Sequence, residues 1–167
     1  MNLNLFNFGG IDLEENPFAE LDEIDIKIID LLQKDSRLSF NRIAKELGIS
    51  VGTAYNRIRG LEEKGVLRGY TAIIDPVKVG YQLTAIILIQ AEGKHLMDVE
   101  SEIARMGNVI SVYDITGEFD IAVIARFKDR FDMNKFIKAL LKMPYVKRTV
   151  TNVVLNVVKE DFRVPLH

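Results

Sequence analysis

The sequence predicts an α+β protein with an N-terminal winged or tri-helical helix-turn-helix domain and a C-terminal ferredoxin-like domain of element order βαββαβ. One observation is the helical period of apolar residues through residues 21–65. Another is the strand-like period over residues 81–160, which two helical segments interrupt. The length of 167 residues is compatible with these two small domains, and it excludes a large multidomain enzyme.

Three short amphipathic helices are expected in the first half of the chain. Ser39 and Ser50 are predicted to cap the second and third helices, because a serine hydroxyl accepts a hydrogen bond from the first helical turn. Gly48 is predicted to end the second helix in the left-handed conformation, and Gly65 ends the third. A short turn from Gly48 to Ser50 between two helices is typical of a DNA-binding helix-turn-helix. The apolar positions are Leu21, Ile24, Ile28, Leu31 and Leu32 in the first helix, Phe40, Ile43, Ala44 and Leu47 in the second, and Val51, Ala54, Ile58 and Leu61 in the third.

The second half alternates strand-like and helix-like segments after a connecting stretch. Residues 66–74 have a strand-like pattern, and Asp75-Pro76 with Gly80 interrupts the chain before the next strand. The expected order from there is strand 81–91, helix 94–106, strand 109–116, strand 119–127, helix 130–143 and strand 146–158. The predicted domains are a flexible N-terminal tail at 1–20, the helix-turn-helix at 21–65, a linking strand or hinge at 66–80, the ferredoxin-like domain at 81–160 and a C-terminal tail at 161–167.

Composition excludes several classes of protein and of site. The chain has no cysteine, so disulfides, thiolate metal sites and a cysteine nucleophile are ruled out. No apolar run reaches the ~20 residues of a membrane-spanning helix, and the acidic N-terminus does not resemble a secretion signal, which makes the cytoplasm the expected location. Neither His95 nor His167 has partners at metal-ligand spacing, and no catalytic or phosphate-binding motif is present. We therefore expect no enzyme activity, metal or cofactor.

A candidate DNA-binding face lies on the third predicted helix. The net charge of the chain is −2, yet residues 36–60 hold five basic residues and one acidic residue. Asn56 and Arg59 lie opposite the apolar face and suit hydrogen bonds to base edges in the major groove. Basic residues around them suit phosphate contacts, although an ordinary solvated helix face would show the same polarity. The candidate DNA-binding residues are Arg37, Arg42, Lys45, Ser50, Gly52, Thr53, Asn56, Arg57 and Arg59.

Short motifs spread over residues 21–160 carry a resemblance to a known family. They are Leu21-Asp22 with Asp25 and Ile28-Ile29, Leu38, Ile43-Ala44, Leu47-Gly48-Ile49-Ser50, Arg57-Ile58, Leu61-Glu62, Gly65-Val66-Leu67, Gly69-Tyr70 and Thr116-Gly117-Glu118-Phe119-Asp120. In this order they resemble the Lrp/AsnC, or feast/famine, transcription regulators. The resemblance implies a RAM or ACT-like C-terminal domain that forms dimers and larger assemblies, such as tetramers or octamers, and binds a small effector, commonly an amino acid.

In such regulators the effector lies between dimers, near the turn that joins the second and third strands of the C-terminal domain. Here that turn contains Gly117, which permits close backbone approach, while Asp114 or Asp120 could pair with an ammonium group. A plain hairpin turn, with threonines present for their strand propensity, would give the same pattern. The candidate effector-binding residues are Tyr113, Asp114, Gly117, Glu118, Phe119, Asp120, Thr149 and Thr151.

Two other functions are compatible with this sequence. A DNA-wrapping architectural protein of low specificity could use the same basic residues, and it would differ in its ratio of specific to non-specific affinity. The Lrp-like fold also resembles the siroheme decarboxylases, which use histidines in a tetrapyrrole pocket. Only two histidines, one of them terminal, argue against that enzyme. The sequence favours a DNA-binding regulator whose partners are double-stranded DNA, a second copy of itself and an amino acid.

Overall fold

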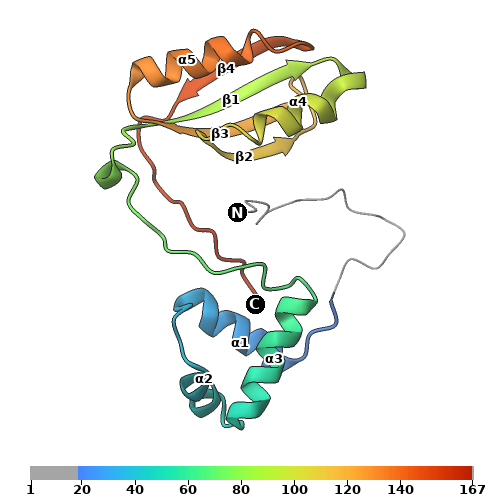
Figure 1. The fold of residues 1–167 in the computed structure, drawn as a ribbon, viewed down its shortest axis with the longest axis vertical. Helices are drawn as coiled ribbons and strands as arrows, with labels where there is room; N and C mark the ends of the chain where they lie inside the picture. The colour runs from blue at the N-terminus through green and yellow to red at the C-terminus, as the bar shows by residue number, and fades with distance from the viewer. Residues whose placement is uncertain (1–18, 167) are drawn as a thin grey trace. The chain divides into compact units, whose positions relative to one another are not determined.

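The computed structural model describes residues 19–166, which form two compact units (Figure 1). One unit contains the described residues through Ile73 together with those from Asp161 onward, and the other contains Ile74–Glu160. Residues 1–18, which make up most of the predicted N-terminal tail, and His167 lie outside the described residues. No helix of the described part of the chain is long and apolar enough to cross a membrane.

The first unit consists of α1 (Glu23–Lys34), α2 (Phe40–Leu47) and α3 (Val51–Glu63). Both serine caps are confirmed, with the hydroxyl of Ser39 accepting from the N–H of Arg42 and that of Ser50 from the N–H of Thr53. Gly48 adopts the left-handed conformation with φ of 66°, which ends α2 as predicted. The three helices enclose one apolar core made of Ile28, Ile29, Leu32, Ile43, Ala44, Ala54, Ile58 and Leu61.

Val51 departs from the predicted core. Its side chain is 46% exposed, although the helical period had placed it on the buried face with Ala54 and Ile58. Val51 is the first residue of α3 and precedes Ala54, the first fully buried side chain of this helix, by three positions. The helical period gives the face on which a residue lies and does not show where the core ends along the axis.

The strand predicted for residues 66–74 is absent from this single chain. Residues 68–75 have no regular secondary structure, and a short 3-10 helix, η1 (Val77–Val79), follows before Gly80 at φ of 94°. A strand exists only where a neighbouring strand supplies backbone hydrogen bonds, and no strand of the described residues pairs with residues 68–75. The side chain of Ile73 is consequently 85% exposed.

The second unit has the predicted βαββαβ order and the strand order β2-β3-β1-β4, with every neighbouring pair antiparallel. Its elements are β1 (Leu83–Ala91), η2 (Gly93–His95), α4 (Leu96–Ile103), β2 (Val109–Asp114), β3 (Ile121–Phe127), α5 (Arg130–Leu140) and β4 (Val146–Val153). The last strand is shorter than the predicted 146–158. Val153 pairs with Ala85 near the start of β1, so the chain beyond has almost no remaining partner.

Both helices of this unit cover the same face of the sheet. Alternate residues of β1 and β3 are buried under them, including Ile87, Ile89 and Val123, and they pack with Ile103 of α4 and Phe136 of α5. The residues between them point to the opposite face. That open face carries Ile86, Leu88, Ala122, Ile124 and Val150, which are exposed or half-buried.

Candidate nucleic-acid interface and effector site

The outer face of α3 presents the residues predicted to read DNA. Asn56 and Arg59 are exposed, on the side opposite the buried Ala54 and Ile58. Gly52 is exposed at the start of the same face, and a Cβ there would meet only the hydroxyl of Ser50 at 3.8 Å. The start of this face therefore carries no side chain at position 52, and packing within the described chain does not require the glycine there.

Ser50 and Thr53 have a structural role at the beginning of α3. The Ser50 hydroxyl accepts from the N–H of Thr53 at 3.0 Å and lies 2.8 Å from the hydroxyl of Thr53. These contacts satisfy one of the free N–H groups at the start of the helix. Both hydroxyls are exposed, so a DNA contact would add to the cap rather than replace it.

Arg59 is paired at the surface of α3. Its guanidinium lies 3.1 Å from Glu62 Oε2 and 4.0 Å from Glu63 Oε1, and the side chain is 53% exposed. Exposed pairs of this kind contribute little to stability, so DNA can displace the glutamates at small cost.

Arg57 is placed differently from the other predicted DNA contacts. Its side chain turns toward α1, where Nη1 donates to the carboxylate of Asp22 and to Oδ1 of Asp25 at 3.1 Å. The N–H of Asp25 and the guanidinium of Arg57 together hold the pKa of Asp22 below its ordinary value. Asp22 also caps α1, so a single guanidinium links α3 to the capped end of α1.

The remaining predicted phosphate contacts lie in and before α2. Arg37 is paired with Asp35 at 3.1 Å, but its side chain is 89% exposed. Arg42 and Lys45 are exposed, and the described residues give neither of them an ion pair. These two cations can therefore meet a phosphate without first breaking an ion pair.

Tyr55 is a residue that the sequence reasoning missed. It lies on α3 beside Asn56, it is 46% exposed, and its ring meets that of Phe40 edge to face with centroids 5.4 Å apart. The contact fixes the orientation of an exposed aromatic ring next to the candidate reading face. Apolar atoms there can contact the methyl group of thymine. The sequence could have indicated Tyr55, because this aromatic residue directly precedes Asn56, which is predicted to contact base edges.

The predicted effector turn is tightly tied to the sheet. Gly117 has φ of 124°, which strains any other residue. The N–H of Ile115 donates to the carbonyl of Asp120 at 2.8 Å, and the N–H of Asp120 donates to the carbonyl of Ile89 at 3.0 Å. The carboxylate of Asp120 accepts from the N–H of Ala91 at 2.8 Å. Asp120, a candidate effector-binding residue, therefore already holds the turn against β1.

A charged cluster next to this turn includes one more residue that the sequence reasoning missed. Arg148 of β4 donates to Glu118 Oε1 at 3.1 Å, and its guanidinium lies 5.3 Å from the centre of the Phe119 ring. Glu118 and Phe119 are thus held against the last strand. No sequence signal indicated Arg148, because its neighbourhood with the turn depends on how β1 aligns β3 and β4.

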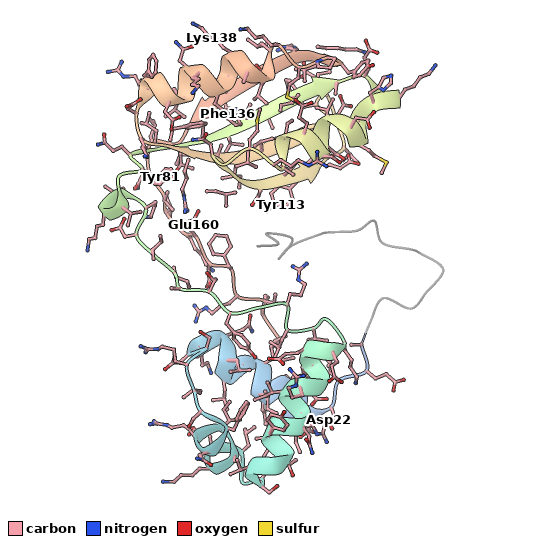
Figure 2. All side chains as sticks on the ribbon, in the orientation of Figure 1. Asp22, Tyr81, Tyr113, Phe136, Lys138 and Glu160 are labelled. Carbon is pink, nitrogen blue, oxygen red and sulfur yellow. The ribbon has the colours of Figure 1, made fainter. Side chains whose placement is uncertain are left out.

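The other candidates lie on different faces of the sheet. Tyr113 of β2 is opposite Ala122 on the open face (Figure 2), whereas Asp114 is opposite Ile121 on the helix-covered face. Asp114 lies near Glu100 of α4, whose pKa is raised by burial and then by this neighbouring charge. Thr149 and Thr151 lie two positions apart and therefore share one face, the helix-covered one, but they belong to the edge strand farthest from β2. One chain therefore does not gather all the candidates into one pocket.

No group of acidic or histidine side chains among residues 19–166 is arranged to hold a metal ion.

Two protein families match separate segments of this chain. The family described as winged helix-turn-helix DNA-binding matches residues 21–68, and the Lrp/AsnC ligand binding domain matches residues 84–164. An uncharacterized HTH-type transcriptional regulator of Pyrococcus abyssi is 55% identical, over 86% of this chain and 97% of its own length. The HTH-type transcriptional regulator FL11 of Pyrococcus horikoshii is 38% identical, over 87% of this chain and 97% of its own.

Solved structures match over most of the chain. A transcriptional regulator from Neisseria meningitidis, solved as its complex with L-Met, has a TM-score of 0.82 and 28% identity, and the match covers 88% of this chain and 97% of that one. An AsnC family transcriptional regulator from Agrobacterium tumefaciens has a TM-score of 0.81 and 26% identity, over 87% and 97% of the two chains. With its helix-turn-helix, its ligand-binding domain and these relatives, the chain belongs to the Lrp/AsnC family of DNA-binding transcription regulators.

Proposed function

We propose that this regulator recognises a specific sequence of double-stranded DNA and that an amino acid, bound by its C-terminal domain, changes that recognition. The observation that carries the proposal is the exposed face of α3, where Asn56 and Arg59 lie opposite the buried side of the helix. The major groove, about 12 Å wide, admits a helix whose amide and guanidinium groups reach base edges. Asn56 and Arg59 are the proposed base readers.

Basic side chains around this face supply affinity for the phosphate backbone. Arg42 and Lys45 are exposed, and Arg37 extends from the loop before α2. Phosphate contacts position a protein on DNA without reading its sequence. The chain carries a net charge of −2, so binding depends on where these cations lie rather than on an overall positive charge.

The DNA-binding form is proposed to be a homodimer. Leu88, Ile124 and Val150 lie on a sheet face that neither helix of the second unit covers, and residues 68–75 form no strand in the described chain. Another copy of the chain can cover the open sheet face and form strand hydrogen bonds with residues 68–75. Two α3 helices would then enter successive major grooves of a roughly palindromic site, about 34 Å apart or a multiple of that. Further association to tetramers or octamers is part of the proposal.

The effector is proposed to bind at the turn around Gly117, with a second dimer completing the site. An amino acid carries one carboxylate and one ammonium group. Arg148 and Glu118 offer the complementary charges, and they are exposed and only 3.1 Å apart. The complex of L-Met with the solved relative from Neisseria meningitidis supports an amino acid as the class of ligand. Tyr113, Asp114, Phe119, Thr149 and Thr151 remain candidate contributors to this site.

Selection of DNA from a random pool tests the proposal. The purified protein is given the pool at one stated salt concentration, with and without a mixture of the twenty amino acids. We expect a palindromic motif whose recovery changes with the mixture. Equal recovery of all sequences would instead support the DNA-wrapping architectural function. A protein that acts on DNA in this way is proposed to work in the cytoplasm.

A further inference from the structure

The C-terminal residues are packed into the helical unit. The sequence predicted a separate tail at 161–167, yet the residues from Asp161 belong to the same compact unit as α1, α2 and α3. Leu166 is partly buried against the apolar core of these helices, alongside Leu31 and Leu67. The helical unit is thus built from both ends of the described chain.

A pair of hydrogen bonds holds this segment on α1. The side-chain oxygen of Gln33 accepts from the N–H of Val164 at 2.6 Å, and the side-chain nitrogen of Gln33 donates to the carbonyl of Val164 at 3.1 Å. A primary amide offers one acceptor and two donors, so it matches both groups of one peptide residue at once. This pairing fixes the direction and the position of the C-terminal segment along α1.

Charges beside the amide pair support the same placement. Arg163 donates twice to Asp161, with Nε to Oδ1 and Nη2 to Oδ2 both at 2.9 Å. Asp161 and, more weakly, Asp30 of α1 raise the pKa of Arg163. Asp30 lies one helical turn before Gln33, so α1 presents an acidic group and then an amide to this segment.

The preceding residue is anchored on the other unit. Glu160 accepts from Nη2 of Arg126 on β3 at 2.6 Å, and the arginine side chain is only 20% exposed. Figure 2 labels Glu160 on the chain that follows β4. The chain passes between the two units first at residues 73–74 and again at residues 160–161, with anchored side chains on both sides of the second crossing.

We propose that residues 161–166 are a second tether through which the C-terminal domain controls the DNA-binding domain. The regulatory half of this inference rests on the proposed function. Coupling between two domains is carried by contiguous networks of packed side chains and hydrogen bonds, and a second anchored connection adds such a network to the linker at residues 73–74. A change in the sheet unit would reach α1 through Glu160, Val164 and Leu166.

Docking of the segment is tested without DNA or effector. Hydrogen exchange of the peptide containing Val164 is compared in the full chain, in Gln33→Ala and in the control Gln82→Ala, which removes an exposed amide from the other unit. Loss of both hydrogen bonds to Val164 should make exchange at least about fivefold faster in Gln33→Ala, and Gln82→Ala should match the wild type. Unprotected exchange of this peptide in the wild type would overturn the tether.

Control of DNA binding is tested with a chain that ends at Glu160 and, as a milder change, with Leu166→Ala. The affinity for the selected DNA is measured with and without the mixture of twenty amino acids. We expect both variants to retain DNA binding, with a smaller amino-acid effect in Leu166→Ala and none in the shortened chain. An unchanged effect in the shortened chain overturns the coupling. A wild type that itself shows no amino-acid effect overturns the effector proposal and the coupling together, while the exchange result still decides the docking.

Discussion

Arg57 of α3 donates to Asp25 in the first turn of α1, with Nη1 and Oδ1 3.1 Å apart, and Asp25 is the only buried charged side chain among residues 19–166. The same nitrogen also donates to Asp22, the residue that caps α1. A carboxylate in this position needs a partner, because an unpaired buried charge is costly. Arg57 therefore fixes α3 relative to α1 within the helical unit.

Replacing Arg57 with alanine should lower the thermal unfolding midpoint of the protein. The substitution leaves the buried Asp25 without its cation and removes the contact to the cap of α1. Arg59→Ala is the matched control, since Arg59 lies two positions later and forms only exposed pairs. Calorimetry should show the larger decrease for Arg57→Ala. If this variant kept the wild-type midpoint and lost DNA affinity, the guanidinium would be a DNA contact, as the sequence suggested.

Asn56→Ala and Arg42→Ala should affect DNA binding in different ways. Loss of a base reader should cost about 1 to 3 kcal/mol at the selected site and little on random DNA. Loss of a phosphate contact should weaken binding to both and reduce the salt slope by about 1. Titrations at several salt concentrations separate the two effects. Equal losses on both kinds of DNA for Asn56→Ala would remove it from the reading face.

Tyr55 should contribute to sequence preference through its aromatic ring. Tyr55→Ala removes an exposed ring that Phe40 holds in place, and we expect affinity for the selected site to fall about threefold to tenfold. Tyr55→Phe should retain most of the affinity if the ring makes the contact. A phenylalanine variant as weak as the alanine variant would assign the contact to the hydroxyl instead.

Tyr70 provides a pH-dependent contact within the helical unit. Partial burial and the hydrogen bond from its hydroxyl to Glu62, 3.1 Å long, raise the pKa of Tyr70 from 10.0 to about 12, although its side chain is 49% exposed. A folded pKa above the unfolded one means that this stabilisation is complete below pH 10 and is lost as the pH rises from 10 toward 12. Ultraviolet titration of the wild type minus Tyr70→Phe should show the late ionisation. Glu62→Gln should shift it to lower pH; an unshifted curve would contradict the assigned contact.

Leu88→Asp should prevent dimer formation. Leu88 lies on the open face of the sheet, next to Val150 across the strand pair, and a carboxylate there would be buried without a partner in the proposed dimer. Phe131→Asp is the control, because Phe131 is 79% exposed on α5 and lies away from that face. Sedimentation equilibrium should give a monomer for the first variant and a dimer for the second. A dimeric Leu88→Asp would place the dimer interface elsewhere.

Local features of the sequence predicted the helices and their ends well. Ser39, Gly48 and Ser50 act through contacts with residues only three or four positions away, so their roles can be read from short segments. The order of strands and helices in the second unit followed from the alternation of strand-like and helical periods after residue 81.

Features that depend on distant partners could not be predicted in the same way. Residues 66–74 have the composition of a strand, but a strand also requires a neighbour that the local pattern does not specify. Arg57 resembles a phosphate contact until the position of α1 beside it is known. Arg148 contacts Glu118 because the sheet brings β4 beside the turn around Gly117, and the local sequence does not show this arrangement.

The packing of Leu166 against the helical unit affects how the protein is made. Residues 21–67 leave the ribosome well before Leu166, which packs against the same core. During that interval the nascent chain has every residue of the candidate reading face but lacks the Leu166 contact behind it. The helical unit reaches the packing described above only once Leu166 has emerged.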